Sequence, residues 1–210
     1  MDVHQTPQNP EKLSLIRAWN GYRAFALGAA VFCAGLVGCD SSYESETDEI
    51  DYAISSATTV TVNSGSFKDS AVKGVDYVSG GQTGTTDADG TFKYEEGGTV
   101  TFSVGGVVIG SGSPSGEGAE VTPVDIVSGG TGDNQAVVNI ARFLQTLDDD
   151  GDPTNGIGIS TEASDAIKSS GKSIDFDVDA TSFSEDASVL EVVQKVAEKT
   201  GLEVELVSET

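Results

Sequence analysis

Four aspartates in the run 147–157, which reads LDDDGDPTNGI, are the residues whose types and spacing could do chemistry. Asp148, Asp150 and Asp152 lie at alternate positions, and Asn155 follows three residues later. Oxygen ligands on alternate residues are typical of a site for a hard cation such as Ca²⁺, which takes about six to eight oxygens. We therefore take Asp148, Asp150, Asp152 and Asn155 as candidate Ca²⁺ ligands.

This aspartate-rich loop does not have the EF-hand pattern. The sixth position from Asp148 is Pro153 instead of Gly, and the twelfth is Ile159 instead of Glu. The run 139–157 is nevertheless similar to a Ca²⁺-binding loop that recurs in secreted and lipidated bacterial proteins. With an incomplete ligand set, we expect a dissociation constant of about 10⁻⁴–10⁻³ M. Further ligands could come from backbone carbonyls, water or a second acidic run, comprising Asp175, Asp177 and Asp179.

The alternative for this loop is a solvated acidic turn that follows a helix. Acids at the carboxyl end of a helix oppose its dipole, and four neighbouring carboxylates repel one another unless a cation neutralises them. We therefore favour Ca²⁺ binding. Asp87 and Asp89 form a weaker metal candidate, for which a hairpin turn is the preferred interpretation.

The absent residue types exclude several classes of enzyme. The only histidine of the sequence is His4, so the segment after position 38 has none. Cys39 is the only thiol in that segment, because Cys33 lies earlier. Ser-His-Asp and Cys-His catalysis, structural zinc and an internal disulfide are thereby excluded. Arg142 is the only arginine after position 38, and we expect it in a structural ion pair with a carboxylate.

A pair of carboxylates across a cleft, as in glycosidases, is the remaining catalytic option. Glu95 or Glu96 with Glu117 could form such a pair, but nothing in their spacing supports it. The sequence therefore predicts a protein without enzymatic activity.

The charge of the chain is strongly negative. Its 210 residues carry 34 acidic and 11 basic side chains, a formal net charge of −23. The segment after residue 38 has 32 acidic and 8 basic residues, a net charge of −24. Such a field repels nucleic acid and attracts cations, so nucleic acid is not an expected partner.

The leading segment has the pattern of a secretion signal. Lys12, Arg17 and Arg23 precede an apolar run of 14 residues at 24–37. That run is shorter than the roughly 20 apolar residues that span a bilayer and fits the apolar part of a signal peptide. The alternatives are an uncleaved membrane anchor or a buried helix, and the polar sequence that begins at Asp40 argues against both.

The run 36–39, Leu-Val-Gly-Cys, resembles the bacterial lipobox. The resemblance implies cleavage before Cys39, a diacylglycerol on the Cys39 thiol, and an N-acyl chain on the new amine. Residues 1–38 would then be a lipoprotein signal peptide and 39–58 an acidic, disordered tether. The implied partner is the lipid bilayer, and the implied location is the bacterial cell envelope, in the inner membrane, the outer membrane or at the cell surface.

Residues 59–110 are expected to form a small antiparallel β-sandwich, because short alternating strands are separated by Gly- and Asp-containing turns. The run 72–109 resembles the carboxypeptidase-regulatory-like, transthyretin-like β modules of bacterial surface proteins. The positions that match that pattern are Val72, Gly74, Tyr77, Gly84, Thr86, Asp87, Asp89, Gly90, Phe92, Tyr94, Val100, Thr101, Phe102, Val104 and Gly105. Such modules mostly serve as spacers or binding platforms, so the match says little about function.

Residues 111–120 are expected to be a flexible Gly/Ser linker, and 121–210 an α+β region with two main helices. The first helix should begin after Asn134 and end near Leu147, because its apolar residues share one face. The second should cover 184–200 and end at Gly201. A shorter helix is expected at 160–170, and extended runs at 121–127, 174–178 and 202–207.

The whole sequence thus predicts an α+β fold with a β-sandwich followed by a mixed region. The expected function is that of a membrane-anchored, acidic, Ca²⁺-stabilised envelope lipoprotein with a non-enzymatic role in binding or envelope structure, with an envelope or surface protein as partner. The alternative is the anchoring or accessory module of an adhesin or of a secreted hydrolase system.

Overall fold

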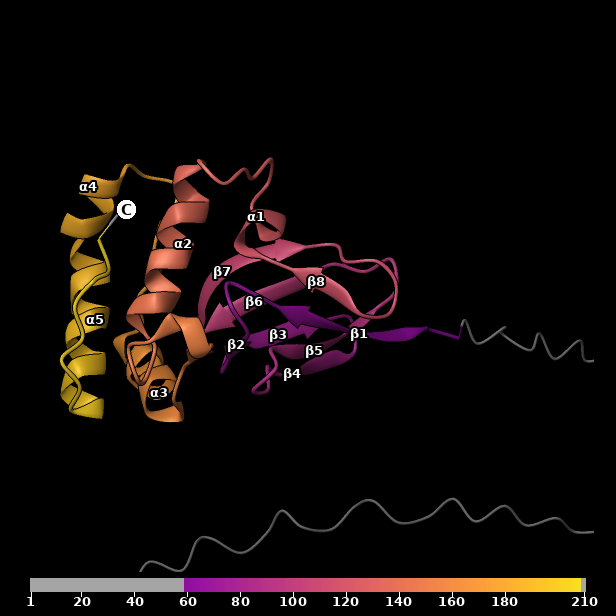
Figure 1. Cartoon of the computed structure of the whole chain (residues 1–210), viewed down its shortest axis with the longest axis horizontal. Helices are drawn as coiled ribbons and strands as arrows, with labels where there is room; N and C mark the ends of the chain where they lie inside the picture. Colours follow the sequence, from indigo (N-terminus) through magenta and orange to yellow (C-terminus); the bar gives the residue numbers. More distant parts are fainter. Residues whose placement is uncertain (1–58, 209–210) are drawn as a thin grey trace, which may run out of the picture. The chain divides into compact units, whose positions relative to one another are not determined.

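A computed structural model describes residues 59–208. The predictions for residues 1–38, 39–58 and Cys39 lie outside these residues. Within the described residues, no helix is long and apolar enough to cross a membrane. The chain is α+β, as its sequence predicts: strands come first, and all the long helices follow (Figure 1).

Two facing sheets form the β part. Strand β6 (Val100–Val104) shows the underlying pattern, because alternate residues are buried and half-buried along its length. The other strands are β1 (Val62–Phe67), β3 (Asp76–Ser79), β4 (Gln82–Thr85), β5 (Thr91–Glu95), β7 (Val107–Gly112) and β8 (Ala119–Val121). One sheet has the order β5-β1-β8 and the other β4-β3-β6-β7.

Aromatic side chains fill the space between the two sheets. The Phe102 ring on β6 lies 4.8 Å from the Phe67 ring on β1 and 5.0 Å from the Phe92 ring on β5, the latter edge-to-face. The Tyr77 ring on β3 lies 6.0 Å from that of Phe92. These rings come from both sheets and are buried, so the predicted sandwich is present.

The predicted linker at 111–120 is not a boundary between two folded parts. Strand β7 continues into it as far as Gly112, and β8 begins within it at Ala119. Strand β8 pairs in parallel with β1, which returns the chain to the sandwich. The buried side chains of the sandwich and of the helices belong to one hydrophobic cluster. The pairing of β8 with β1 depends on residues far apart in sequence, which local composition does not reveal.

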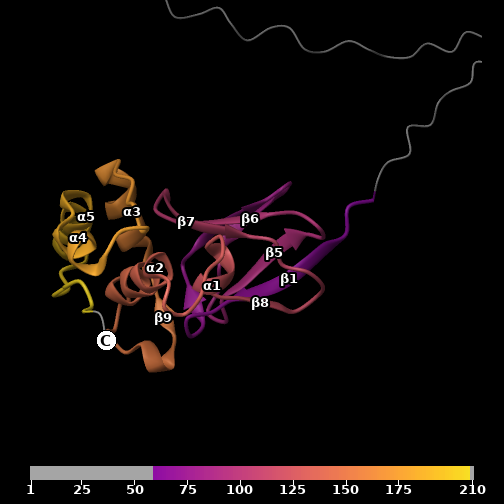
Figure 2. The ribbon, with the colours of Figure 1, turned by 90° about the horizontal axis from the view of Figure 1, so that it is seen from above.

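Four longer helices lie together at one end of the sandwich (Figures 1 and 2). They are α2 (Gln135–Thr146), α3 (Thr161–Ser170), α4 (Ala180–Glu185) and α5 (Ala187–Thr200). The Asn134 side chain caps α2 by accepting bonds from the amides of Ala136 and Val137, as expected. Gly171 ends α3, in the left-handed conformation that glycine adopts readily.

Two predicted elements take another helical form. Residues 121–127 contain a short helix, α1 (Pro123–Ile126), capped by Thr122 with Asp125. The predicted helix 184–200 is instead the two helices α4 and α5, which are separated by Asp186. Asp186 ends the first helix and caps the second with its carboxylate.

The predicted strands at 174–178 and 202–207 are irregular segments. The side-chain NH₂ group of Asn139 on α2 donates to the carbonyls of Phe176 (3.0 Å) and Val178 (2.9 Å). These bonds replace the backbone bonds that a neighbouring strand would make. Val204 and Leu206 pack against the core without joining a sheet. In both runs, burial of alternate apolar residues explains the pattern that predicted a strand.

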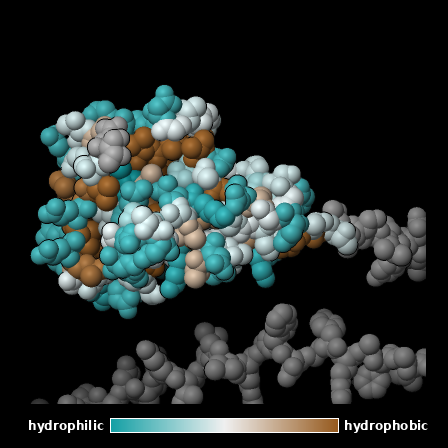
Figure 3. All heavy atoms as spheres, in the orientation of Figure 1, coloured by the Kyte–Doolittle hydropathy of each residue, from teal (hydrophilic) through white to brown (hydrophobic). Residues whose placement is uncertain are grey.

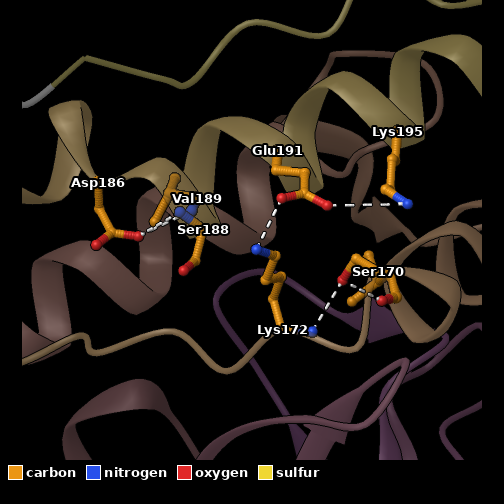
Figure 4. Close-up of polar contacts among 8 residues, drawn as sticks. Ser170, Lys172, Asp186, Ser188, Val189, Glu191 and Lys195 are labelled. Atoms are coloured by element: carbon orange, nitrogen blue, oxygen red, sulfur yellow. Dashed lines mark hydrogen bonds and ion pairs between the residues drawn. The ribbon is translucent and has the colours of Figure 1, made fainter.

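The segment that follows α3 is joined to α5 by a surface ion pair (Figure 4). The Lys172 Nζ atom lies 2.8 Å from a Glu191 oxygen on α5, and Lys195, one turn further along α5, approaches the same carboxylate at 3.9 Å. Both lysines and the glutamate are partly exposed, so these pairs contribute little to stability. The face in Figure 3 is largely hydrophilic, and most of its visible hydrophobic atoms lie over the helices.

Candidate metal centre

The aspartate-rich loop is fixed at both ends. It begins at Leu147, the residue that ends α2, and leads through the 3₁₀ turn η1 (Pro153–Asn155) into β9 (Ile157–Gly158). Strand β9 pairs in parallel with β2 (Val72–Lys73), and the Ile157 amide donates to the Ala71 carbonyl. The loop therefore connects the end of α2 to the sandwich.

Three carboxylates converge at the start of the loop. Asp148, Asp149 and Asp150 each offer an oxygen atom, and these atoms all lie within 4.8 Å of one another. We call these three residues the carboxylate cluster. Asp149 and Asp150 are exposed, whereas Asp148 is only 8% exposed.

Asp148 has one satisfied and one unsatisfied oxygen. Its Oδ1 atom accepts a bond of 2.8 Å from the Gly158 amide. Its Oδ2 atom is buried and has no hydrogen-bond partner among the described residues. Burial raises the pKa of the Asp148 carboxyl; the bond from Gly158 opposes this, and the charges of Asp150 and Asp149 add to it, as does the hydrogen bond that protonated Asp148 can form with Asp150. A carboxylate in this position lacks compensation for its lost hydration.

Asp150 occupies a more favourable environment. Its Oδ2 accepts from the Asn155 amide at 2.9 Å, and its Oδ1 accepts from the Asp152 backbone amide at 2.9 Å. These bonds, that from Asn155 foremost, hold the pKa of Asp150 below its usual value. Asp150 therefore remains charged beside Asp148, whose own ionisation is disfavoured.

The side chains that the structure brings together differ from the predicted ligands. Asp152 lies outside the cluster because it caps η1, where its Oδ1 accepts from the Thr154 amide at 3.1 Å and from the Thr154 hydroxyl. Asn155 acts as a hydrogen-bond donor to Asp150. Asp149, which was not predicted, takes the place of Asp152. The missed signal is Gly151, whose φ of 71° bends the chain and breaks the alternation assumed from sequence.

Two cavities adjoin the cluster. One, of about 450 Å³, is lined by all three cluster residues together with residues 202–205 and Val207. A smaller one, of about 200 Å³, is lined by the same three aspartates, Asn155 and Lys73. The carboxylates can therefore be reached by a small hydrated ion.

The other aspartate candidates are occupied by local bonds. Asp87 accepts from the backbone amides of Asp89 and Thr91, and the bond from Thr91 is the main cause of its lowered pKa. The turn at Asp87 joins β4 to β5, which lie in different sheets, so the predicted hairpin is wrong. Asp179 caps α4, and Asp175 accepts from the Asp177 amide. These five residues do not join the carboxylate cluster.

The glutamates considered for catalysis hold the backbone together. Glu117 accepts from the Ser64 amide at 2.9 Å, and Glu96 accepts from the Gly116 amide at 3.0 Å. Glu95 accepts from the Gly81 amide at 2.6 Å. These bonds fasten turns and a loop around the sandwich.

Arg142 has neutral partners instead of the predicted ion pair. Its guanidinium donates to the Val207 carbonyl at 2.7 Å, to the Asn139 side chain at 3.1 Å and to the Ser184 hydroxyl at 2.9 Å. It also lies over the Phe183 ring at 5.5 Å. Arg142 forms no ion pair within residues 59–208 and instead joins α2, α4 and the segment 202–207.

Comparison with known proteins gives no relative for this chain. No protein-family model matches it, and neither a curated protein nor a solved structure is similar to it.

Proposed function

We propose that this chain is a lipid-anchored, non-enzymatic protein of the bacterial cell envelope whose folded part binds Ca²⁺ at the carboxylate cluster. The observation that carries the metal proposal is the Oδ2 atom of Asp148, which is buried, lacks a partner and lies beside two further carboxylates. A cation at this point would supply the missing interaction.

The geometry favours a hard cation with oxygen ligands. Ca²⁺ binds oxygens at about 2.3–2.6 Å, so two ligands on opposite sides of the ion lie about 5 Å apart. The cluster oxygens lie within 4.8 Å of one another, which is compatible with one shared ion. The donors are carboxylates in an irregular loop, which suits Ca²⁺ better than Mg²⁺, because Mg²⁺ requires near-octahedral geometry.

The position of the loop suggests a structural role for the ion. Asp148 follows the last residues of α2, and its Oδ1 accepts from Gly158 on β9. The neighbouring Asp149 amide donates to the Gly158 carbonyl at 2.9 Å. An ion at the cluster would therefore stabilise the junction between the helices and the sandwich.

Calorimetric titration of the full-length protein with Ca²⁺ tests the metal proposal. We expect one site with a dissociation constant of about 10⁻⁴–10⁻³ M and weaker binding of Mg²⁺. The variant Asp148→Asn should abolish the heat of binding. Asp152→Asn is the matched control, since it removes the same charge from the same loop but leaves the cluster intact, and Asn also caps helices well. No heat with the native protein would refute the proposal.

Lipid anchoring is supported by the lipobox-like run 36–39. Each buried lipid CH₂ contributes about 0.8 kcal/mol, so two or three acyl chains on Cys39 would give stable attachment. Mass spectrometry of the mature amino terminus should find a diacylglyceryl and an N-acyl group on Cys39, and Cys39→Ala should release the protein from membranes. An unmodified Cys39 in membrane-extracted protein would contradict this part.

A further inference from the structure

The larger cavity at the carboxylate cluster is also lined by the segment that follows α5. Glu203 and Glu205 line this cavity of about 450 Å³ together with Leu202, Val204 and Val207, and the two glutamates lie outside the group of carboxylates whose oxygens are within 4.8 Å of one another. No Lys or Arg is among the described residues that line it. Two acidic segments, more than fifty residues apart in sequence, thus face one space without a protein cation between them.

The segment 202–207 presents its acids to this cavity for a simple reason. Val204 and Leu206 are half-buried and pack against the core, while Glu203 and Glu205 remain exposed. This alternation places the carboxylates on the side away from the core. Both lie in an irregular segment, so no ladder of backbone hydrogen bonds fixes them there.

Two hydrogen bonds between the backbone of Val207 and side chains of α2 hold the segment against that helix. The Val207 amide donates to the Thr146 hydroxyl at 3.0 Å, and the Val207 carbonyl accepts from the Arg142 side chain at 2.7 Å. Thr146 is the last residue of α2, two positions before Asp148. The segment is therefore attached at the same end of α2 at which the carboxylate cluster begins.

We propose that the Ca²⁺ ion at the carboxylate cluster also bridges to Glu203 and Glu205 and so fastens the segment 202–207 to α2. This inference rests on the proposed function and adds further ligands and a conformational consequence to the same site. The cavity has the volume of about fifteen water molecules, so the bridge includes water in the coordination shell. The unpartnered Oδ2 of Asp148 indicates where the ion would bind. The position of Glu203 and Glu205 at the same cavity indicates which segment it would bridge to.

Hydrogen exchange measured by mass spectrometry on the full-length protein tests the bridge. The peptide covering 202–208 includes the Val207 amide, whose protection depends on its bond to Thr146. We expect Ca²⁺ to slow exchange in this peptide by about tenfold relative to protein in chelator, with MgCl₂ giving less protection.

Paired glutamine variants supply the control. The double variant Glu203→Gln with Glu205→Gln should lose the Ca²⁺-dependent protection and bind Ca²⁺ at least about threefold more weakly. Glu185→Gln with Glu198→Gln removes two equal charges from α4 and α5, outside this cavity, and should behave as the native protein. Circular dichroism verifies that both variants are folded.

The outcomes separate the two proposals. Equal protection in the native protein and in the Glu203/Glu205 variant would overturn the bridge. Absence of protection in a native protein that still binds Ca²⁺ through Asp148 would also overturn it and leave the proposed function standing. Absence of any Ca²⁺ binding by calorimetry would refute both.

Discussion

Replacing Asp148 with Asn should change the stability of the protein in opposite directions with and without Ca²⁺. In chelator, the native protein keeps a buried carboxylate whose Oδ2 has no partner and whose neighbours are also acidic. An unsatisfied buried group costs about 1–3 kcal/mol. Asn retains an oxygen for the Gly158 amide and gains an NH₂ group that can donate to Asp149 or Asp150. We therefore expect Asp148→Asn to stabilise the metal-free protein by about 1–2 kcal/mol.

In the presence of Ca²⁺ the native protein should become more stable than Asp148→Asn. At about 10 mM Ca²⁺ and a dissociation constant of about 10⁻⁴–10⁻³ M, binding adds about 1.4–2.7 kcal/mol to the native protein. The Asn variant lacks the buried anionic ligand and should gain almost nothing. Urea denaturation in chelator and in CaCl₂ measures both free energies of unfolding. Asp152→Asn should respond to Ca²⁺ as the native protein does.

The pH dependence of stability tests the same reasoning independently. Burial raises the pKa of Asp148 in the folded protein, so its protonation contributes stability that is fully present below the unfolded pKa of about 3.9. This contribution to stability is lost as pH rises through the folded pKa. The advantage of Asp148→Asn in chelator should therefore be absent at low pH and appear as pH rises. A variant less stable than the native protein in chelator at neutral pH would refute the reasoning.

Three further predictions concern the frame around the site. Gly74→Ala should lower the free energy of unfolding, measured in urea, by more than about 2 kcal/mol, because φ is +90° and the new Cβ would lie 2.2 Å from the Ile159 carbonyl oxygen. Gly97→Ala is the control: φ is +74° but the space around it is free, so it should cost only about 1 kcal/mol. Arg142→Lys should cost about 2–3 kcal/mol in the same assay, since one ammonium cannot reproduce the three-way fork. Hydrogen bonds from Ser182 lower the pKa of Asp179 in the folded protein. The stability that the Asp179 carboxylate contributes is therefore present above its unfolded pKa and lost as pH falls through its folded pKa. Asp179→Asn should keep the helix cap and remove this pH dependence from acid-unfolding curves.

Local signals were sufficient where short-range chemistry determines the element. The cap at Asn134 and the ends of α3 and α5 at Gly171 and Gly201 follow from side-chain and backbone preferences within a few residues. The strands of the sandwich follow equally from alternation between turns. These features required no knowledge of partners elsewhere in the chain.

Elements that depend on distant partners were not predictable in the same way. The alternating run 174–178 is an irregular segment because Asn139, on another element, bonds its carbonyls. Strand β8 exists because β1 offers it a parallel edge. Alternation shows that one side of a segment is buried, and it does not show whether another strand supplies the backbone hydrogen bonds.

In the candidate site, too, local sequence predicts one part and the folded conformation determines the other. Composition located the loop, because four aspartates around a glycine are seldom stable without compensation. Which carboxylates come together depends on the backbone conformation at Gly151 and on Thr154, whose amide and hydroxyl bond Asp152. The cluster therefore contains Asp149 and not Asp152, and the identity of the Ca²⁺ ligands stays a prediction.

The strong acidity of the chain would compensate for the weak affinity proposed for the Ca²⁺ site. A net charge of −24 after residue 38 raises the concentration of cations near the surface, so the proposed site, with its few ligands, would still fill at millimolar Ca²⁺. The same charge destabilises the folded state through repulsion, most of all where acidic segments meet. Around the larger cavity at Asp148, two such segments meet without a lysine or arginine among its described lining residues, and Lys73 lines only the smaller one. An ion taken from solution and bound in the larger cavity would then make the stability of this junction depend on the Ca²⁺ concentration around the protein.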